Sequence, residues 1–335
     1  MIPGRPSRQR WASRAAAAAL TALVCLLTSG QPAQAAPSAA IVRIDPITPR
    51  WLRVFVRSPA MQAVMQVQLL LPRNTADPRP TVYLLDGRTA EGNGNHWTDR
   101  GGAVTFFADK PVNVVLTVGG TASYYTDWQR VDPRLGRYRW ETFLTKELPP
   151  LLDGRFGGDG RNAVAGVSMG AQAALMLAFR NPQRYAAAAG FSGCYGAADD
   201  PDEAEMHLVV ASSGGNATNM FGETADPDWA AHDVVVHAAA LRGKALYLSS
   251  GTGLPGPHET VDDPDVGDSI VLGGPIEAVA NACTHRLADR LGQLGISAKV
   301  NFRPVGTHSW PYWADDLHDA WPTLAAGLGI SVPGR

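Results

Sequence analysis

The chain has 335 residues, of which 45% are hydrophobic and 18% are charged. Its 29 basic residues include four arginines before Ala15, and the 25 that remain face 31 acidic residues. A mildly acidic chain without a basic cluster argues against nucleic acid as a partner. The length suffices for one large domain with a substantial core.

Residues 1–35 have the pattern of a secretory signal peptide. The arginines precede a short apolar run over residues 15–27, and Ala-Gln-Ala at residues 33–35 forms a small-x-small cleavage site. We expect cleavage after Ala35, with Cys25 leaving in the apolar run. Residues 36–335 are predicted to form a single domain, secreted or held in the cell envelope. No later segment of the sequence has the roughly 18 uninterrupted apolar residues of a membrane span.

Apolar runs predict strands at residues 52–58, 64–72, 81–87, 112–120, 162–167, 185–193, 244–251 and 298–306. Helical spacing predicts helices over residues 140–156, 172–180, 275–295 and 312–329. Strands alternating with helices predict an α/β fold with a mostly parallel central sheet covered on both faces. Residues 36–44 look like a polar lead-in. Longer irregular segments, which often form sites, are expected at 88–110, 121–138, 196–232 and 252–274.

The sequence Gly-Val-Ser-Met-Gly at residues 166–170 separates a predicted strand from a predicted helix. G-x-S-x-G in this setting is typical of a sharp turn that presents a serine at the carboxyl end of a sheet. The following helix N-terminus favours a developing anion. A chance match is the alternative, and the flanking strand and helix argue against it. Ser168 is therefore the predicted nucleophile.

A serine nucleophile needs a base, and the base needs a carboxylate to hold it. In this architecture the chain order is serine, acid, histidine. His308 directly follows the last predicted strand, which makes it the predicted base. The other histidines after Ser168 lie too early, in a loop or inside a helix: His207, His232, His237, His258, His285 and His318.

The acid is not settled by spacing. Its candidates precede His308: Glu259, Asp262, Asp263, Asp265, Asp268 and Glu277. Position favours the group at residues 259–268, because the acid often lies in the loop directly after its strand. The alternative interpretation of that group is a solvated acidic loop.

Acyl transfer also needs two N–H donors for the oxyanion. One is the backbone N–H of Met169, and the other is expected from the loop after residues 83–87, at Arg88. Asp86 is either a turn residue or a polar contact for substrate.

The two cysteines outside the leader are Cys194 and Cys283. In an exported protein such a pair is more often a disulfide than two free thiols. The alternative is two buried apolar side chains. No histidines or cysteines have metal-ligand spacing, so neither a metal nor another cofactor is expected.

Six segments together resemble the antigen 85 type mycolyltransferases of mycolate-bearing actinobacteria, and the similarity spans residues 45–330. They are YLLDG (83–87), SYYTDW (123–128), YRWETFLTKELP (138–149), GVSMG (166–170), MFGETADPDW (220–229) and GTHSWPYW (306–313). The resemblance implies an exported α/β-hydrolase that moves a mycolyl chain, a long α-branched β-hydroxy acyl group. The implied donor is trehalose monomycolate. The implied acceptor is a second trehalose monomycolate, cell-wall arabinogalactan or a protein, and we expect a monomer.

By motif position, the resemblance makes Ser168 the nucleophile and His308 the base, and it places the acid at Glu277, ahead of the acidic loop. The N–H groups of Arg88 and Met169 become the oxyanion donors. Two further residues take the positions that contact trehalose, namely Asp86 and Trp310.

One departure concerns the sugar site. The family usually reads D-G-L-R-A where this chain has Asp-Gly-Arg-Thr-Ala at residues 86–90, so Thr89 replaces an arginine and Arg88 precedes it. A shift of one residue points the arginine side chain elsewhere, so the sequence leaves trehalose affinity and acceptor choice open. Four tryptophans in the loops are candidates for binding sugar and excluding water, or for packing: Trp97, Trp128, Trp310 and Trp313.

Two rival functions remain on the sequence alone. One is a secreted carboxylesterase with the same triad, which would release the acid to water. The other is a non-catalytic protein that binds cell wall or host matrix, against which the intact Ser168 and His308 argue.

Overall fold

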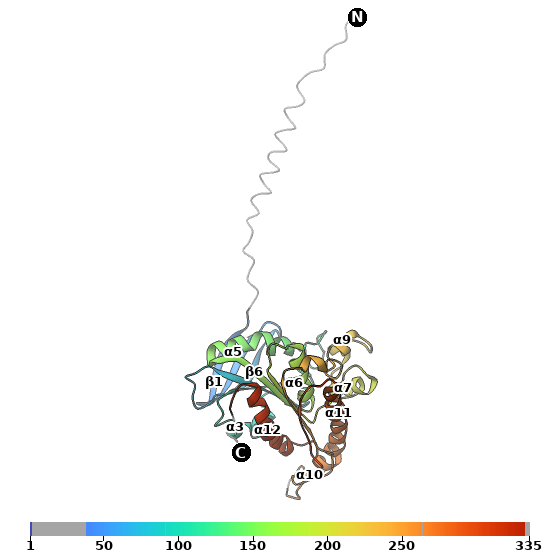
Figure 1. Cartoon of the computed structure of the whole chain (residues 1–335). Helices are drawn as coiled ribbons and strands as arrows, with labels where there is room; N and C mark the ends of the chain where they lie inside the picture. Colours follow the sequence, from blue (N-terminus) through green and yellow to red (C-terminus); the bar gives the residue numbers. More distant parts are fainter. Residues whose placement is uncertain (2–37, 91, 263, 332–335) are drawn as a thin grey trace. The chain divides into compact units, whose positions relative to one another are not determined.

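The fold was analysed in a computed structural model that describes residue 1 and residues 38–90, 92–262 and 264–331 (Figure 1). The predicted signal peptide beyond Met1 and the acid candidate Asp263 lie outside the described residues. From Ala39 onward the chain forms one compact unit. In the part of the chain that is described, no helix is long and apolar enough to cross a membrane.

A nine-stranded sheet forms the centre of this unit, in the order β1-β2-β3-β5-β4-β6-β7-β8-β9. The strands from β5 to β9 along this order pair in parallel, whereas β1, β2 and β3 pair antiparallel. Their bounds are β1 Ala40–Thr48, β2 Trp51–Ser58, β3 Ala63–Leu70, β4 Arg79–Leu85, β5 Asn113–Thr117, β6 Gly158–Val167, β7 Ala187–Phe191, β8 Ala245–Ser250 and β9 Lys299–Phe302. The predicted mostly parallel sheet is confirmed.

The predicted lead-in at residues 36–44 is wrong from Ala40, where β1 begins. This strand lies at the edge of the sheet and pairs with β2 alone. An edge strand tolerates polar residues and a proline such as Pro46, because one side of its backbone needs no partner strand. Because β1 contains polar residues and a proline, it has no continuous apolar run from which a strand would be predicted.

The central strands send alternate side chains into two cores. On β4, Tyr83 and Leu85 join one buried cluster, whereas Val82 and Leu84 join the other. Successive side chains of a strand point to opposite faces. Because both faces are covered, the strand has an unbroken apolar sequence rather than an alternating one.

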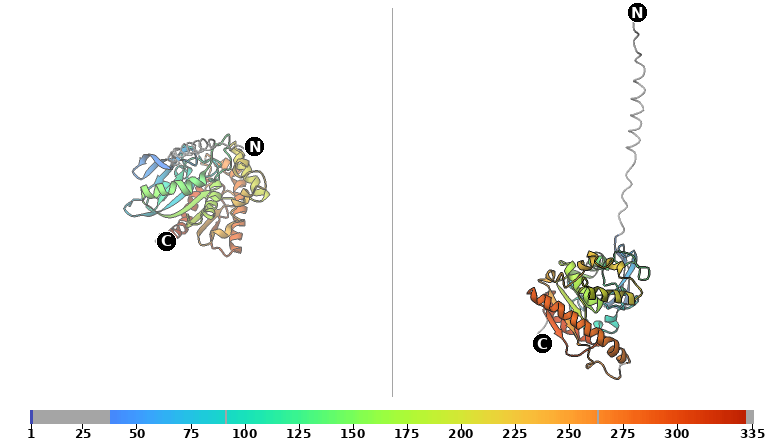
Figure 2. Two further views of the ribbon diagram at one scale, coloured as in Figure 1. Left: turned by 90° about the horizontal axis from the view of Figure 1, so that it is seen from above. Right: turned by 90° about the vertical axis from the view of Figure 1, so that its right-hand side faces the viewer.

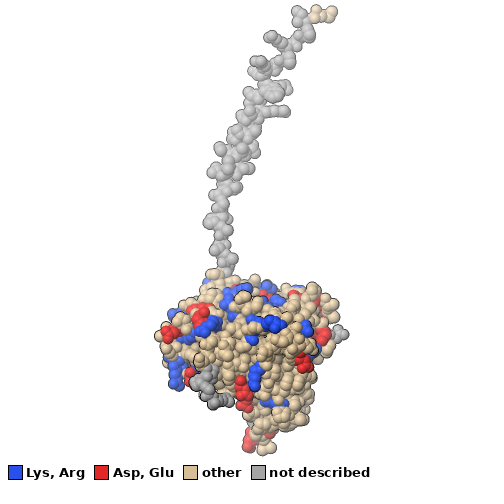
Figure 3. All heavy atoms as spheres, in the orientation of Figure 1, with Lys and Arg blue, Asp and Glu red and all other residues tan. Residues whose placement is uncertain are grey.

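Helices cover each face (Figure 1). The cluster with Tyr83 includes residues from α5 (Leu148–Phe156), α6 (Met169–Arg180) and α11 (Gly274–Gln293). The cluster with Val82 includes residues from α3 (Ala103–Phe106) and α12 (Trp310–Gly327). In the right-hand view of Figure 2, α11 is the long orange helix. Basic and acidic side chains are interspersed over the face drawn in Figure 3.

The segment 140–156 is helical throughout but not uniform. It contains α4 (Trp140–Thr142), a π-helical turn η1 (Phe143–Glu147) and α5, which begins with prolines at its first turn. Proline is tolerated there because the first N–H groups of a helix have no partner within the helix.

The expected irregular segment 196–232 contains a 13-residue helix, α7 (Asp200–Ser212). Its start has local signals: the Asp199 side chain accepts a hydrogen bond from the N–H of Asp202, and Pro201 lies in the first turn. The rest of the segment holds α8 (Thr218–Phe221) and α9 (Pro227–Ala231). The other short helices are α2 (His96–Asp99), η2 (Ala238–Leu241), α10 (Val266–Asp268) and η3 (Ser269–Gly273).

Candidate active site

Ser168 lies in a strained turn between β6 and α6. Its backbone has φ 54° and ψ −124°, and its N–H donates a hydrogen bond of 2.9 Å to the carbonyl oxygen of Phe191. A positive φ is rare for a residue with a side chain and is retained where the surroundings enforce it. The turn places Ser168 at the N-terminus of α6, at the carboxyl edge of the sheet.

Neighbouring backbone atoms leave no room for a side chain at either glycine of the motif. A Cβ on Gly166 would lie 2.1 Å from the carbonyl oxygen of Gly170, and one on Gly170 would lie 2.4 Å from that of Asp86. Both obstacles are backbone atoms, which cannot rotate away as a side chain can. The close approach of α6 to β6 and to the end of β4 therefore requires glycine at both positions.

His308 follows β9 in the loop before α12, and Glu277 lies in the first turn of α11. The ring nitrogen Nδ1 of His308 is 2.8 Å from Oε2 of Glu277. The N–H of His308 donates to the carbonyl oxygen of Gly273, at 3.2 Å, which ties the loop of His308 to the start of α11. The ring of Trp313 packs edge-on against the imidazole, with centroids 4.9 Å apart.

The buried Glu277 carboxylate is held on its other oxygen as well. Oε1 accepts hydrogen bonds from the Ser192 hydroxyl (2.7 Å), the Gly251 N–H (2.6 Å) and the Arg303 guanidinium (3.4 Å). The indole N–H of Trp313 donates to the Ser192 hydroxyl at 3.0 Å. These donors offset the free-energy cost of burying a carboxyl group away from water.

Sequence analysis missed Ser192 and Arg303. A signal existed for Ser192, because it directly follows β7 just as Ser168 follows β6. Adjacent parallel strands end at the same edge of the sheet, where sites of α/β proteins form. Arg303 follows β9 at that edge, and its guanidinium also binds the carboxylate of Asp316, a buried residue of α12. Burial raises the pKa of Asp316 to about 6, although Arg303 opposes the shift.

The other acid candidates lie elsewhere. The Glu259 carboxylate accepts hydrogen bonds from the hydroxyls of Thr307 and Tyr312, both at 2.6 Å. Burial disfavours its charge, but these hydrogen bonds prevail and lower the pKa of Glu259. It therefore braces the loop that carries His308. The exposed candidates are Asp262, Asp265 and Asp268.

Ser168 and His308 line one cavity of about 440 Å³. Among the hydrogen bonds of the described residues, none joins the Ser168 hydroxyl to the imidazole of His308. Such contacts in enzymes without substrate often tighten only on binding. Arg88 and Met169 also line the cavity. Within the described residues, neither backbone N–H donates a hydrogen bond.

Asp86 is fully buried and meets the cavity through His96, whose ring lines it. The carboxylate oxygen Oδ2 accepts from the His96 backbone N–H at 3.0 Å and lies 3.5 Å from its Nδ1. Burial raises the pKa of Asp86, with the His96 contacts acting in the opposite direction. Sequence analysis gave His96 no role.

The four loop tryptophans divide into two pairs. Trp97 and Trp128 are buried, and their indole N–H groups donate to the carbonyl oxygens of Leu85 and Ser123. Their role is packing. Trp310 and Trp313 line the cavity, with ring centroids 5.1 Å apart.

The departure at residues 88–89 lies at the rim of the cavity. Arg88 and Thr89 are both exposed and both line it. The Arg88 guanidinium donates to the Ser212 hydroxyl of α7 at 3.3 Å. The arginine side chain is therefore bound to the helix beside the cavity.

Cys194 and Cys283 form a disulfide, with Cα atoms 4.8 Å apart, and the predicted pairing is confirmed. It joins the loop after β7 to α11, the helix that carries Glu277. Among the described residues, no group of three histidine, cysteine, aspartate or glutamate side chains could hold a metal ion.

This sheet, with its serine turn at the carboxyl edge, makes the protein an α/β-hydrolase. The family model for putative esterases matches residues 58–324. A diacylglycerol acyltransferase/mycolyltransferase, Ag85B of Mycobacterium avium, is 32% identical over 76% of this chain and 77% of its own. The chain belongs to the antigen 85 family of acyltransferases, and the predicted resemblance is confirmed.

Two further comparisons agree. Ag85B of Mycobacterium leprae is 30% identical over 97% of this chain and 95% of its own. The crystal structure of Mycobacterium tuberculosis MPT51 (FbpC1) superposes with a TM-score of 0.70 at 24% identity, covering 84% of this chain and 100% of that one. At this identity the superposition supports the fold alone.

Proposed function

We propose that this protein transfers a mycolyl group from trehalose monomycolate to a hydroxyl acceptor through an acyl-enzyme on Ser168. The observation that carries the proposal is the cavity that Ser168 shares with His308, whose Nδ1 is bound to the buried Glu277. Relatives in the antigen 85 family are named mycolyltransferases, which supports the mycolyl group. The family resemblance of the sequence implies trehalose monomycolate as the donor.

In the first half-reaction, the Ser168 hydroxyl attacks the ester carbonyl while Nε2 of His308 takes its proton. Glu277 fixes the tautomer that leaves Nε2 unprotonated and stabilises the imidazolium that forms. The N–H groups of Arg88 and Met169 bind the developing oxyanion. Collapse of the intermediate breaks the ester bond, and His308 returns the proton to the departing trehalose oxygen.

In the second half-reaction, an acceptor hydroxyl attacks the Ser168 ester and gives its proton to His308. The bond between the acyl carbon and Oγ of Ser168 then breaks, and His308 returns the proton to Oγ. The products are the new ester and free Ser168. Transfer requires that the acceptor alcohol outcompete water. The apolar walls of the cavity and the indoles of Trp310 and Trp313 support this, because they exclude water and offer faces for a sugar ring. The acceptor is a second trehalose monomycolate, arabinogalactan or a protein.

Residues 1–35 are proposed to direct export and to be removed, which leaves residues 36–335 as one domain acting in the cell envelope or outside the cell. The basic and apolar leader supports this. So does the disulfide, because such bonds persist in oxidising compartments.

The test is incubation of the mature protein with trehalose monomycolate, beside a Ser168→Ala variant, with chromatography of the lipids. Trehalose dimycolate formed by wild type alone would establish the transferase. It would also show that Arg88 and Thr89 accept trehalose in place of the family's usual arrangement.

Two other results have clear meanings. Free mycolic acid without dimycolate would identify a carboxylesterase, the second candidate. If wild type neither turns over substrate nor reacts with an organophosphonate, the result would indicate a non-catalytic binding protein.

A further inference from the structure

The residues lining the cavity come from two regions of different chemistry. The loop after β4 and the start of α12 contribute polar and aromatic groups, including Thr89, His96 and Trp310. The helices α7 and α11 contribute the apolar side chains Val209, Ile276, Val279 and Ala280. An acyl chain therefore fits between α7 and α11, and the sugar fits toward α12.

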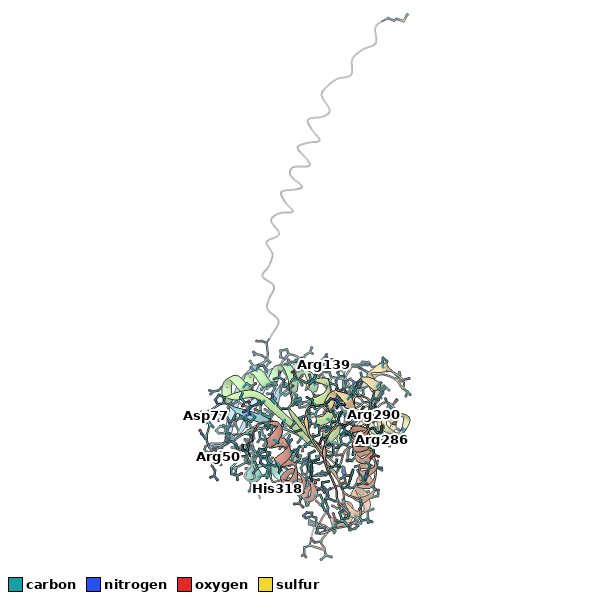
Figure 4. All side chains as sticks on the ribbon, in the orientation of Figure 1. Arg50, Asp77, Arg139, Arg286, Arg290 and His318 are labelled. Atoms are coloured by element: carbon teal, nitrogen blue, oxygen red, sulfur yellow. A yellow bond between two sulfur atoms is a disulfide. The ribbon has the colours of Figure 1, made fainter. Side chains whose placement is uncertain are left out.

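The helices α7 and α11 are linked by charge. The Arg286 guanidinium of α11 is 3.0 Å from the Asp199 carboxylate, which caps α7, and it also binds Asp202. Figure 4 labels Arg286 on the part of the molecule that contains α11. These ion pairs hold α7 and α11 against each other. A polar side chain on either helix therefore has a defined position relative to a bound acyl chain.

One residue that lines this apolar part of the cavity, Glu205, is acidic. Glu205 lies one helical turn before Val209 on α7, so both share a face. Its oxygen Oε2 accepts a hydrogen bond of 3.2 Å from the Tyr124 hydroxyl. Within the described chain, no group hydrogen-bonds to Oε1. Glu205 is half-buried and lines the cavity, so a ligand in the cavity can reach this oxygen.

Tyr124 also links Glu205 to the residue that follows Ser168. The backbone N–H of Tyr124 donates to Sδ of Met169 at 3.4 Å. Met169 follows the nucleophile and provides a proposed oxyanion donor. Ser168, Met169 and Glu205 line the same cavity, so an acyl group on Ser168 occupies the space that the Glu205 carboxyl faces.

The protonation of Glu205 suits contact with a hydroxyl. Burial raises the pKa of this carboxyl to about 7, with the charge of Asp202 adding to the shift and the Tyr124 hydrogen bond opposing it. Near neutral pH the group is protonated in a large share of molecules. It can then donate a hydrogen bond as well as accept one.

We infer that Glu205 is a specificity residue that hydrogen-bonds to a hydroxyl near the carbonyl of the donor acyl group, and so favours 3-hydroxyacyl over unsubstituted donors. This inference rests on the proposed function, because it takes the donor ester to react at Ser168. The mycolyl group carries such a hydroxyl.

The experiment compares p-nitrophenyl 3-hydroxydecanoate with p-nitrophenyl decanoate by release of nitrophenol. Neither ester carries sugar, so the comparison isolates the acyl group. We expect wild type to have the higher kcat/KM for the hydroxylated ester. Glu205→Leu and Glu205→Ala should reduce this preference about tenfold, the effect of one lost hydrogen bond. Glu205→Gln should keep most of it, because an amide both donates and accepts.

The matched control is Val209→Ala on the same face of α7, which should change kcat/KM for both esters alike. The ratio of two substrates does not depend on how much of a variant is folded. An unchanged ratio in Glu205→Leu and Glu205→Ala, with wild type turning over both esters, would overturn the role of Glu205 alone. Wild-type rates no higher than those of Ser168→Ala would overturn the proposed function, and this inference with it.

Discussion

Nδ1 of His308 lies 2.8 Å from Oε2 of Glu277, with the histidine side chain 11% exposed and the glutamate fully buried. The carboxylate is thus shielded from water while the imidazole reaches the cavity. A charge in a shielded site acts more strongly on its neighbour than the same charge in solvent. This contact is the basis of the first prediction.

Glu277→Gln should reduce kcat about 100- to 10,000-fold, because an amide neither enforces the right tautomer nor stabilises the imidazolium. Steady-state kinetics on trehalose monomycolate would measure the loss, and KM should change little. The control is Asp268→Asn, which removes an exposed candidate acid and should leave kcat within about twofold. A loss in the control equal to that of Glu277→Gln would contradict the assignment of the acid.

The hydroxyl of Ser192 donates to Glu277, and we expect Ser192 to position this carboxylate. Ser192→Ala removes one donor to the carboxylate and leaves the indole N–H of Trp313 without its partner. We expect a roughly tenfold lower kcat with an unchanged KM. In the double variant with Glu277→Gln, the loss should be no greater than for Glu277→Gln alone, because the two residues act as a unit. Additive losses would mean that Ser192 acts independently of the acid.

The sequence was sufficient for every strand of the sheet except the edge strand β1, because strands buried on both faces have continuous apolar runs, as β4 does with Val82 to Leu85. Ser168 could be proposed because it directly follows β6 in a recognisable motif, and His308 because it lies in the loop after the last strand. The choice of Glu277 came from the family resemblance alone. Nothing in its local sequence indicates that the start of α11 meets the histidine loop.

The remaining residues of the site depend on three-dimensional contacts. Glu205 looks like one of several acids on a polar helix, and α7 itself lies in a segment expected to be irregular. Its position against the cavity follows from the packing of Tyr124 on Met169 and from the links between α7 and α11. Arg303 likewise matters only because β9 ends beside Glu277.

The disulfide should stabilise both the fold and the site. Its cysteines are separated by 89 positions, so it closes a long loop in the unfolded chain. Replacing Cys194 and Cys283 together with serine should lower the free energy of unfolding by about 2–5 kcal/mol, measured by urea unfolding. Wild type treated with reductant should match the double variant. Equal stability with and without reductant would show that the bond does not form in the mature protein.

The last prediction concerns stability and pH. The pKa of Glu205 is about 7 in the folded protein, above its ordinary value of 4.5. As pH rises from about 4.5 to 7, the unfolded chain ionises first and is favoured, so this residue lowers stability with rising pH. Between pH 4.5 and 7, the free energy of unfolding of wild type should fall by on the order of 1–3 kcal/mol relative to that of Glu205→Gln. Above pH 7 the difference between the two proteins should stay constant.

Urea unfolding of both proteins from pH 4.5 to 8.5 would measure this difference. The contributions of the other titrating groups cancel because both proteins contain them. Val209→Gln is a matched control that adds an amide on the same face and keeps Glu205, so its difference from wild type should not vary with pH. If wild type and Glu205→Gln stay parallel throughout, Glu205 has an ordinary pKa and is solvated. The carboxyl would then be charged at neutral pH and would act toward an acyl hydroxyl only as an acceptor.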